Sequence, residues 1–299
     1  MILVIGEILF DVFENEKRLG GAPFNFAYHL KNLGFPVRFI SRIGNDALGK
    51  KILRILAQHH FDVDDIQIDD RHDTGTVAVR LSSSGNPIFR INTDAAYDYI
   101  HYLPNEHSSL MDKADVIYFG TLAQRSKQGF ENIRKFLKNR RPDSLCFYDI
   151  NLRQNCYSDK VILSSLEYAD ILKLNTQELD ECRKIFRFSK DNDTFIPFLM
   201  NQCALKIVAV TRGDKGSELF TGDGSFQSKR TRVLSIIDTV GAGDAYSAML
   251  VVGMIKGWDP DRMLSMASIF SSRICEIRGA IPESREFYEP IREMIINGG

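Results

Sequence analysis

The sequence lacks any run of about 18 apolar residues, the length that a membrane-spanning helix needs. Its first segment, MILVIGEILFDVF, is apolar, but Glu7 and Asp11 interrupt it and no basic stretch precedes it, so a signal peptide is not indicated. The chain also lacks an excess of either charge: 38 Lys and Arg against 39 Asp and Glu give −1, too little to attract nucleic acid or an anionic membrane. We therefore expect a cytoplasmic protein whose partners are small molecules.

Cysteine is scarce, and the five that are present have no CxxC spacing. An odd number without that spacing argues against a disulfide framework and against a zinc site, so we expect reduced thiols. The six histidines show no spacing typical of metal ligands, and no internal repeat is visible. With 44% hydrophobic and 26% charged residues, the composition is that of an ordinary folded protein.

Strand-like and helix-like stretches alternate along most of the chain, which predicts an α/β fold with a mostly parallel sheet and helices on its faces. Strands are expected at 2–5, at VRFISRIG, and in the segments DVIYFG, LCFYDI, DILKLN and KIVAVT. Helices are expected near 22–33, 46–58, 126–138, 159–168, 175–203, 242–256 and 260–275. After Thr211, GSELF and GSFQSK predict a short antiparallel meander.

One segment interrupts this alternation. TGTVAVRLSSSGNPIFRIN predicts two strands joined by a turn at Ser84 to Pro87, with no helix between them. Together with ILFDVF and KRLG, this hairpin would form a small sheet that acts as a lid. We expect a single domain over residues 1–299, with a lid formed by about 8–20 and 66–97, and a possible homodimer through the exposed edge of the lid.

The stretch DTVGAGDAYSA, residues 238–248, combines a glycine turn with the start of a helix. Free N–H groups and the positive end of the helix dipole gather there and make a seat for an anion. It is not a Walker loop, since no GK[ST] follows, and Tyr246 replaces the third glycine of a Rossmann fingerprint. Asp244 could take a proton from a substrate hydroxyl; the alternative is an ordinary first-turn acid that favours the dipole.

Three further segments carry polar side chains with two interpretations each. In GGAPFN, Gly21 would let a ligand approach the backbone and Asn25 would face hydroxyl groups, unless the segment is only a turn before a helix. Asp11 would accept two hydroxyl hydrogen bonds or simply face solvent. In DINLR, Arg153 would bind phosphate through its forked guanidinium or form a loop salt bridge.

KLNTQE ends a strand and opens a helix, where Asn175 and Glu178 fit a capping box. Ligands bind at this end of strands in open α/β sheets, so the same two side chains could also hold the waters of Mg²⁺. TRGDKGS, residues 211–217, is a glycine-bearing loop after a strand, with a plain β-turn as its alternative.

Taken in order, GEILFD, GGAPFN, DINLR, KLNTQE, TRGDKGS, DTVGAGDAYSA and RGAIP span residues 6–282, and this succession resembles the PfkB (ribokinase-like) family of ATP-dependent sugar kinases. The resemblance implies a ribokinase-like three-layer αβα sandwich with a β lid. It also implies transfer of the γ-phosphoryl group of ATP to a primary hydroxyl of a sugar, with Mg²⁺ and, in many relatives, a monovalent cation such as K⁺.

The resemblance also implies roles for residues that match the motifs. Asp244 would be the base, and the anion hole would comprise Gly241, Ala242 and Gly243. Mg²⁺ would be supported by Asn175 and Glu178, and Asp238 and Thr239 would belong to the monovalent-cation loop. Acceptor-sugar positions would be Asp11, Gly21 and Asn25, with Arg90 and Arg153 at the acceptor or phosphate. Nucleotide positions would be Thr211, Gly213, Gly216 and Ser268.

Within the family, GGAPFN and GEILFD look most like bacterial fructokinases, so fructose is the expected acceptor. Two departures affect this expectation: Asp94-Ala95-Ala96 replaces the usual Ala-Asp after the lid arginine, and Ser268 and Glu276 stand where Asn and Thr are expected near adenine. The alternatives are a 2-keto-3-deoxygluconate kinase, in which Arg90 or Arg153 meets a carboxylate, a ribokinase-type activity, less favoured because of Pro23, and a catalytically silent sugar or nucleotide binder.

Overall fold

The computed structural model describes residues 1–81, 87–189, 191–228 and 235–297, and its chain divides into two compact units. Unit 1 contains Met1–Phe24 and Val37–Ser144, and unit 2 contains Asn25–Pro36 and Leu145–Gly299. The single domain expected from the sequence stays a prediction. In the part of the chain that is described, no helix is both long and apolar enough to cross a membrane.

The larger sheet of unit 1 is parallel, and two of its strands, Ile2–Ile5 and Val116–Gly120, are fully buried, as is typical of parallel sheets. Its strands, in spatial order, are β8 (Val116–Gly120), β1 (Ile2–Ile5), β4 (Val37–Gly44) and β5 (Ile66–Asp69). Every residue of β1 is buried. The helices of this unit are α2 (Ala47–Gln58), α3 (Pro104–Lys113) and α4 (Lys127–Lys138). The first and third were expected from their periodicity, whereas α3, which is polar apart from two buried apolar side chains, was missed.

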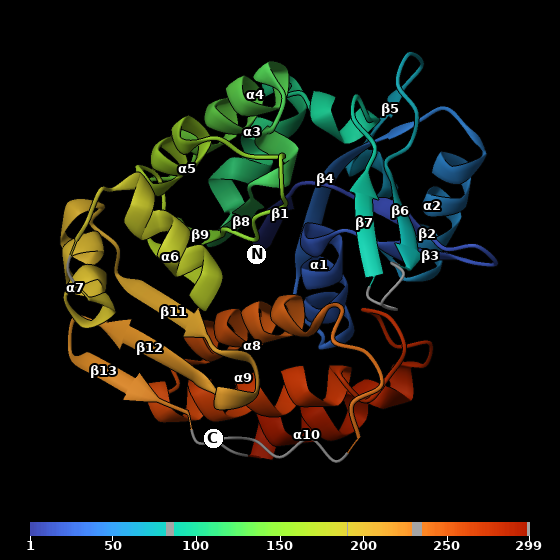
Figure 1. The fold of residues 1–299 in the computed structure, drawn as a ribbon. Coiled ribbons are helices and arrows are strands. Elements are labelled where there is room, and N and C mark those ends of the chain that lie inside the picture. The colour runs from blue at the N-terminus through green and yellow to red at the C-terminus, as the bar shows by residue number, and fades with distance from the viewer. Residues whose placement is uncertain (82–86, 190, 229–234, 298–299) are drawn as a thin grey trace. The chain divides into compact units, whose positions relative to one another are not determined.

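The predicted small sheet of unit 1 is present (Figure 1). Its strands, in spatial order, are β3 (Lys17–Gly20), β2 (Leu9–Val12), β6 (Thr76–Leu81) and β7 (Pro87–Ile91). The insertion is shorter than expected, because residues 66–69 pair with β4 in the larger sheet, where the Arg42 guanidinium donates to the Asp69 carboxylate at 2.7 Å. The expected turn lies outside the described residues except for Pro87, which begins β7.

Unit 2 contains the remaining strands. Those after Thr211 pair antiparallel, which confirms the meander predicted from the sequence. In spatial order they are β13 (Gly224–Gln227), β12 (Ser217–Thr221), β11 (Ile207–Thr211), β10 (Ile171–Asn175) and β9 (Leu145–Asp149). Two helices, α6 (Thr176–Ile185) and α7 (Asn192–Gln202), replace the single helix expected over 175–203. The helix breaks because Arg187, just beyond α6, has a left-handed φ of 51°.

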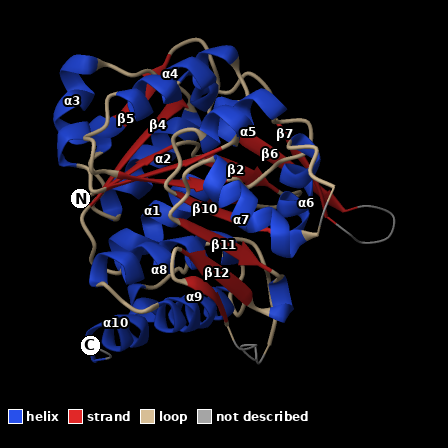
Figure 2. Cartoon of the chain, turned by 90° about the vertical axis from the view of Figure 1, so that its left-hand side faces the viewer, coloured by secondary structure: helices blue, strands red, loops and turns tan. Residues whose placement is uncertain are grey.

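The other helices of unit 2 are α5 (Asp159–Leu166), α8 (Ala242–Lys256), α9 (Pro260–Ile274), α10 (Glu289–Asn297) and most of α1 (Ala22–Asn32). Figure 1 shows α6 and α7 on one side of the strands and α8 and α9 on the other, and Figure 2 shows α8 and α9 beside β11 and β12. All residues from Asp244 to Gly253 are buried. The helix that carries the glycine motif is therefore a core helix, apolar nearly all round.

Candidate active site

The glycine turn forms the N-terminus of α8, as its sequence predicts. Gly241 caps the helix with a left-handed φ of 81°, and a Cβ there would lie 2.5 Å from Cβ and 2.6 Å from Cα of Ala280. Only glycine satisfies both constraints. The first N–H groups of a helix have no intrahelical acceptor, and the helix dipole adds positive character at this end. The turn at Gly241, Ala242 and Gly243 is thus built to hold an anion.

Asp244 lies in the first turn of α8 and is only 7% exposed. Burial, assisted by the nearby charge of Asp149, raises the pKa of its carboxyl to about 7, although the Asn25 hydrogen bond and the charges of Lys173 and Arg153 act in the opposite direction. The Asn25 side-chain amide, on α1, donates to Asp244 Oδ2 at 2.7 Å. A carboxyl that titrates near neutral pH is matched to proton transfer.

A buried polar network that the sequence analysis missed lies at the same helix end. Lys173 Nζ on β10 donates to Asp149 Oδ1 on β9 at 3.1 Å, and Ser247 Oγ on α8 lies 2.8 Å from Asp149 Oδ2. The available signal was a lysine inside the otherwise apolar strand DILKLN. Burial disfavours the Lys173 ammonium, but the carboxylates of Asp149, Glu178 and Asp244 outweigh it and raise the pKa of Lys173, which therefore stays charged.

Asn175 and Glu178 form the capping box that their spacing predicts at the start of α6. Asn175 Oδ1 accepts from the Glu178 amide at 2.9 Å, and Glu178 Oε2 accepts from the Asn175 amide at 2.8 Å. Glu178 Oε1 also accepts from the Leu152 amide, which follows β9, at 2.9 Å. Burial raises the pKa of Glu178, while the charge of Lys173 lowers it. Its bonds to the Leu152 and Asn175 backbone amides place the Glu178 carboxylate where β9 and β10 end. Ligands usually bind at this end of the strands in such a sheet.

Among the described residues no group of three or more His, Cys, Asp and Glu could hold a metal ion. That finding rules out only a dedicated all-protein cage. Mg²⁺ in phosphoryl-transfer sites uses one or two carboxylates, with waters and substrate phosphates as its other ligands. The oxygens of Glu178 and Asn175, at the carboxyl end of β10, fit that pattern.

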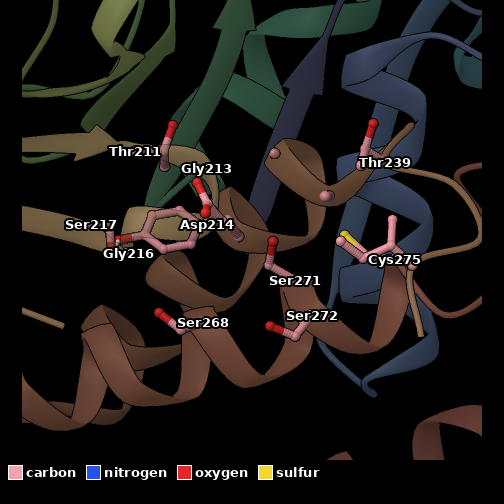
Figure 3. A pocket seen from close by; sticks show the side chains of 14 residues that line it. Thr211, Gly213, Asp214, Gly216, Ser217, Thr239, Ser268, Ser271, Ser272 and Cys275 are labelled. Atoms are coloured by element: carbon pink, nitrogen blue, oxygen red, sulfur yellow. Dashed lines mark hydrogen bonds between the residues drawn. The ribbon is translucent and has the colours of Figure 1, made fainter. Parts of the chain in front are cut away.

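A pocket of about 750 Å³ in unit 2 adjoins the glycine turn. Residues at its wall that the sequence analysis singled out are Thr211, Gly213, Gly216, Thr239, Ala242, Gly243 and Ser268. Figure 3 shows Ser268, Ser271 and Ser272 along α9, with Thr211 and Ser217 on the strand side. The loop after β11 and the anion turn, widely separated in sequence, thus line one pocket of a size suited to a small ligand.

Two other predicted positions of unit 2, Asp238 and Arg153, are not part of the pocket wall. Asp238 uses both carboxylate oxygens to fix its loop, accepting from the Val240 amide at 3.1 Å and the Gly279 amide at 3.0 Å. Arg153 is exposed, and its charge lowers the pKa of Asp244.

Three predicted acceptor positions belong to unit 1. Asp11 is half-buried on β2, and its Oδ2 would lie 3.0 Å from a Cβ added at Gly20. Gly21 has φ 109°, and a Cβ there would lie 2.6 Å from the backbone oxygen of Glu7, so a side chain is excluded. Arg90 is exposed on β7.

The model of the pfkB family of carbohydrate kinases matches residues 4–286. A sugar kinase of Pyrococcus horikoshii is 28% identical over 99% of this chain and 97% of its own. Its structure in complex with ATP aligns with a TM-score of 0.80 at 26% identity, over 99% of this chain and 100% of that chain. A fructokinase of Salmonella typhimurium is 26% identical over 89% of this chain and 88% of its own.

A solved fructokinase of Xylella fastidiosa with bound ATP aligns with a TM-score of 0.85 at 20% identity, over 99% of this chain and 98% of that chain. The predicted fold class, a ribokinase-like α/β sandwich with a small β-sheet, is confirmed by these structural neighbours.

Proposed function

The chain belongs to the pfkB family of carbohydrate kinases and is an ATP-dependent kinase, and we propose that it phosphorylates a primary hydroxyl of fructose. The observation that carries the proposed chemistry is the buried Asp244 carboxyl, with a pKa raised to about 7, in the first turn of a helix whose N-terminus is built for an anion. The fructokinase relative, at 26% identity, supports the choice of acceptor.

In the proposed reaction the sugar hydroxyl oxygen bonds to the γ-phosphorus of ATP as the bond to the β,γ-bridging oxygen breaks. Asp244 accepts the hydroxyl proton, and ADP leaves with the bridging oxygen. The N–H groups at Gly241, Ala242 and Gly243 stabilise the charge on the phosphoryl group during transfer. Because Asn25 holds Asp244 Oδ2 at 2.7 Å, the other carboxylate oxygen, Oδ1, is the one assigned to the proton.

The nucleotide is proposed to occupy the 750 Å³ pocket, with its phosphates at the turn and with Thr211, Gly213, Gly216 and Ser268 around the remainder. Asn175 and Glu178 would hold Mg²⁺ through water, and the ion would neutralise phosphate charge. Asp238 and Thr239 are assigned to a K⁺-binding loop by family resemblance. Dimerisation through the small sheet and a cytoplasmic location stay predictions from the sequence.

The acceptor is proposed to bind through Asp11, Gly21 and Asn25, with Arg90 and Arg153 near acceptor or phosphate. A 2-keto-3-deoxygluconate kinase is the second candidate, because either exposed guanidinium could pair with a substrate carboxylate. A ribokinase-type acceptor is third. A catalytically silent binder loses its support, because the chain belongs to a kinase family.

The test measures ADP release with Mg-ATP against fructose, ribose, 2-keto-3-deoxygluconate and a nucleoside. We expect selective turnover of fructose in the parent and a loss of about 10²–10⁴-fold in Asp244→Asn. The matched control is Asp259→Asn, which keeps an oxygen acceptor at the N-cap of α9 and should retain full activity.

Two outcomes would overturn parts of the proposal. Full turnover by Asp244→Asn would remove the assigned base. Preference for the keto acid over fructose, lost in Arg90→Ala or Arg153→Ala with little change for neutral sugars, would establish the second candidate instead.

A further inference from the structure

A buried ion pair between Lys173 and Asp149 lies next to the anion turn, and neither residue has a role in the proposed reaction. We propose that Lys173 is a positioning residue of the kinase, whose ammonium group, held by Asp149 against the first turn of α8, balances the charge around Asp244 and keeps that carboxyl available as a base. This inference rests on the proposed role of Asp244.

The geometry ties three elements together at one point. Asp149 uses both oxygens, one toward Lys173 Nζ at 3.1 Å and the other toward Ser247 Oγ at 2.8 Å. Ser247 Oγ is also 3.0 Å from the backbone oxygen of Gly243. Lys173 is 6% exposed, and Asp149 and Ser247 are fully buried. The ends of β9 and β10 are thus fastened to the helix turn that carries the base.

Gly243 shows how closely the ammonium approaches the turn. A Cβ at this position would lie 3.1 Å from Lys173 Nζ, tighter than an ordinary contact. The charge of Lys173 therefore lies directly against the backbone assigned to the anion. An ammonium carries three donors, and Asp149 receives one of them, so the group also adds positive charge beside the N-terminus of α8.

Stability alone is a poor reason for such a pair. Desolvation of two buried charges often outweighs their attraction, and apolar replacements of buried ion pairs are frequently neutral or stabilising. A buried lysine–aspartate pair at the turn that carries the base is better explained by its effect on the neighbouring carboxyl.

Groups of opposite sign face Asp244. Burial and the Asp149 charge raise the pKa of Asp244, whereas the Asn25 hydrogen bond and the charges of Lys173 and Arg153 lower it. Glu178, on α6, acts on this set through its charge interaction with Lys173. Removing Lys173 would leave the Asp149 charge without its counter-ion and raise the pKa of Asp244; removing the Asp149 charge would lower it.

The test compares Lys173→Met, Asp149→Asn, the double variant and Ser247→Ala by the pH dependence of kcat/KM for the best acceptor. The Asp244-dependent decline at low pH should move up by about one pH unit in Lys173→Met and down by about one in Asp149→Asn. At a pH below the decline of both the parent and the variant, a shift of one pH unit corresponds to a tenfold change in kcat/KM. The double variant should return close to the parent, and Ser247→Ala, which removes no charge, should lower kcat without moving the decline.

A purely structural role would lower activity without these opposite shifts. The inference is overturned if the decline stays in place in both single variants, or if both move it in the same direction. Should Lys173→Met fail to fold, because it leaves Asp149 buried without its cation, Asp149→Asn and the double variant still decide the matter.

Failure of the inference can be told from failure of the proposed function. Retained turnover in Asp244→Asn would remove the base itself. Independently of activity, the difference in unfolding free energy between each background and the same background with Asp244→Asn, followed against pH, reports the pKa of Asp244. The same opposite shifts are expected in that measurement.

Discussion

At the scale of single residues, the site depends on a carboxyl held in an unfavourable environment. Asp244 is buried in a core helix, where its carboxylate accepts a side-chain hydrogen bond from Asn25. Its folded-state pKa of about 7 lies above the ordinary value of 3.8. The folded protein therefore prefers the protonated form, and ionisation of this group, which the proposed reaction requires, opposes folding.

The first prediction follows from the sign of that shift. The stabilising contribution of Asp244 is complete below pH 3.8 and is lost as the pH rises through about 7. Asp244→Asn lacks this loss, so its unfolding free energy should rise relative to that of the parent between pH 4.5 and pH 8, by about 3 kcal/mol. Urea unfolding of both proteins at pH 4.5, 6 and 8 measures the difference; a gap that stays constant with pH would contradict the assigned shift.

At the scale of elements, the start of α6 combines an observed helix cap with a proposed Mg²⁺ site. The capping box of Asn175 and Glu178 begins α6 by local rules, and the same carboxylate accepts from the Leu152 amide after β9. The sequence predicts the cap, and the structure confirms it. Because both side chains also lie at the carboxyl end of β10, capping and the proposed support of Mg²⁺ are compatible.

The second prediction separates these purposes by comparing two helix caps. Asn175 and Asp259 each accept from a backbone amide at 2.9 Å, at the starts of α6 and α9. Asn175→Ala and Asp259→Ala should each lose about 1 kcal/mol of unfolding free energy. In Asn175→Ala alone, the Mg²⁺ concentration for half-maximal turnover should rise several-fold. If the two variants showed equal Mg²⁺ dependence, Asn175 would have no role in Mg²⁺ binding and would act only as a helix cap.

At the scale of the whole molecule, the predicted ligand positions divide between the two units. All residues lining the 750 Å³ pocket belong to unit 2, as do Asp244, Lys173 and Glu178, whereas Asp11, Gly21 and Arg90 belong to unit 1. Nucleotide and sugar should therefore protect different segments of the chain from amide hydrogen exchange.

The third prediction states which segments each ligand should protect from amide hydrogen exchange. Mg-ADP alone should slow exchange in residues 211–217, 239–246 and 268–275 of unit 2 and have little effect on residues 9–21 and 76–81. Fructose, added alone, should protect the segments of β2 and β3. Protection of 9–21 by nucleotide alone would contradict this division, and absence of any change with fructose would argue for another acceptor.

Local chemistry explains what the sequence determined by itself. Gly241 and Gly257, both in the left-handed conformation, cap the two ends of α8. Because these glycines are visible in the sequence, the helix was predicted over the same residues that the structure shows. The capping box of α6, the small sheet and the parallel strands were likewise predicted, because periodicity and turn residues act within a few positions. Two helices, the mostly polar α3 and the C-terminal α10, were missed.

Tertiary structure decided which side chains meet. Asn25 and Asp244 are 219 residues apart, Asp149 and Ser247 are 98 apart, and Lys173 reaches Asp149 across 24. No local pattern encodes such pairings, because they arise when strands and a buried helix pack together. The shift in the pKa of Asp244 has the same origin: its largest cause is burial, which is a property of the packed core and not of the motif around it.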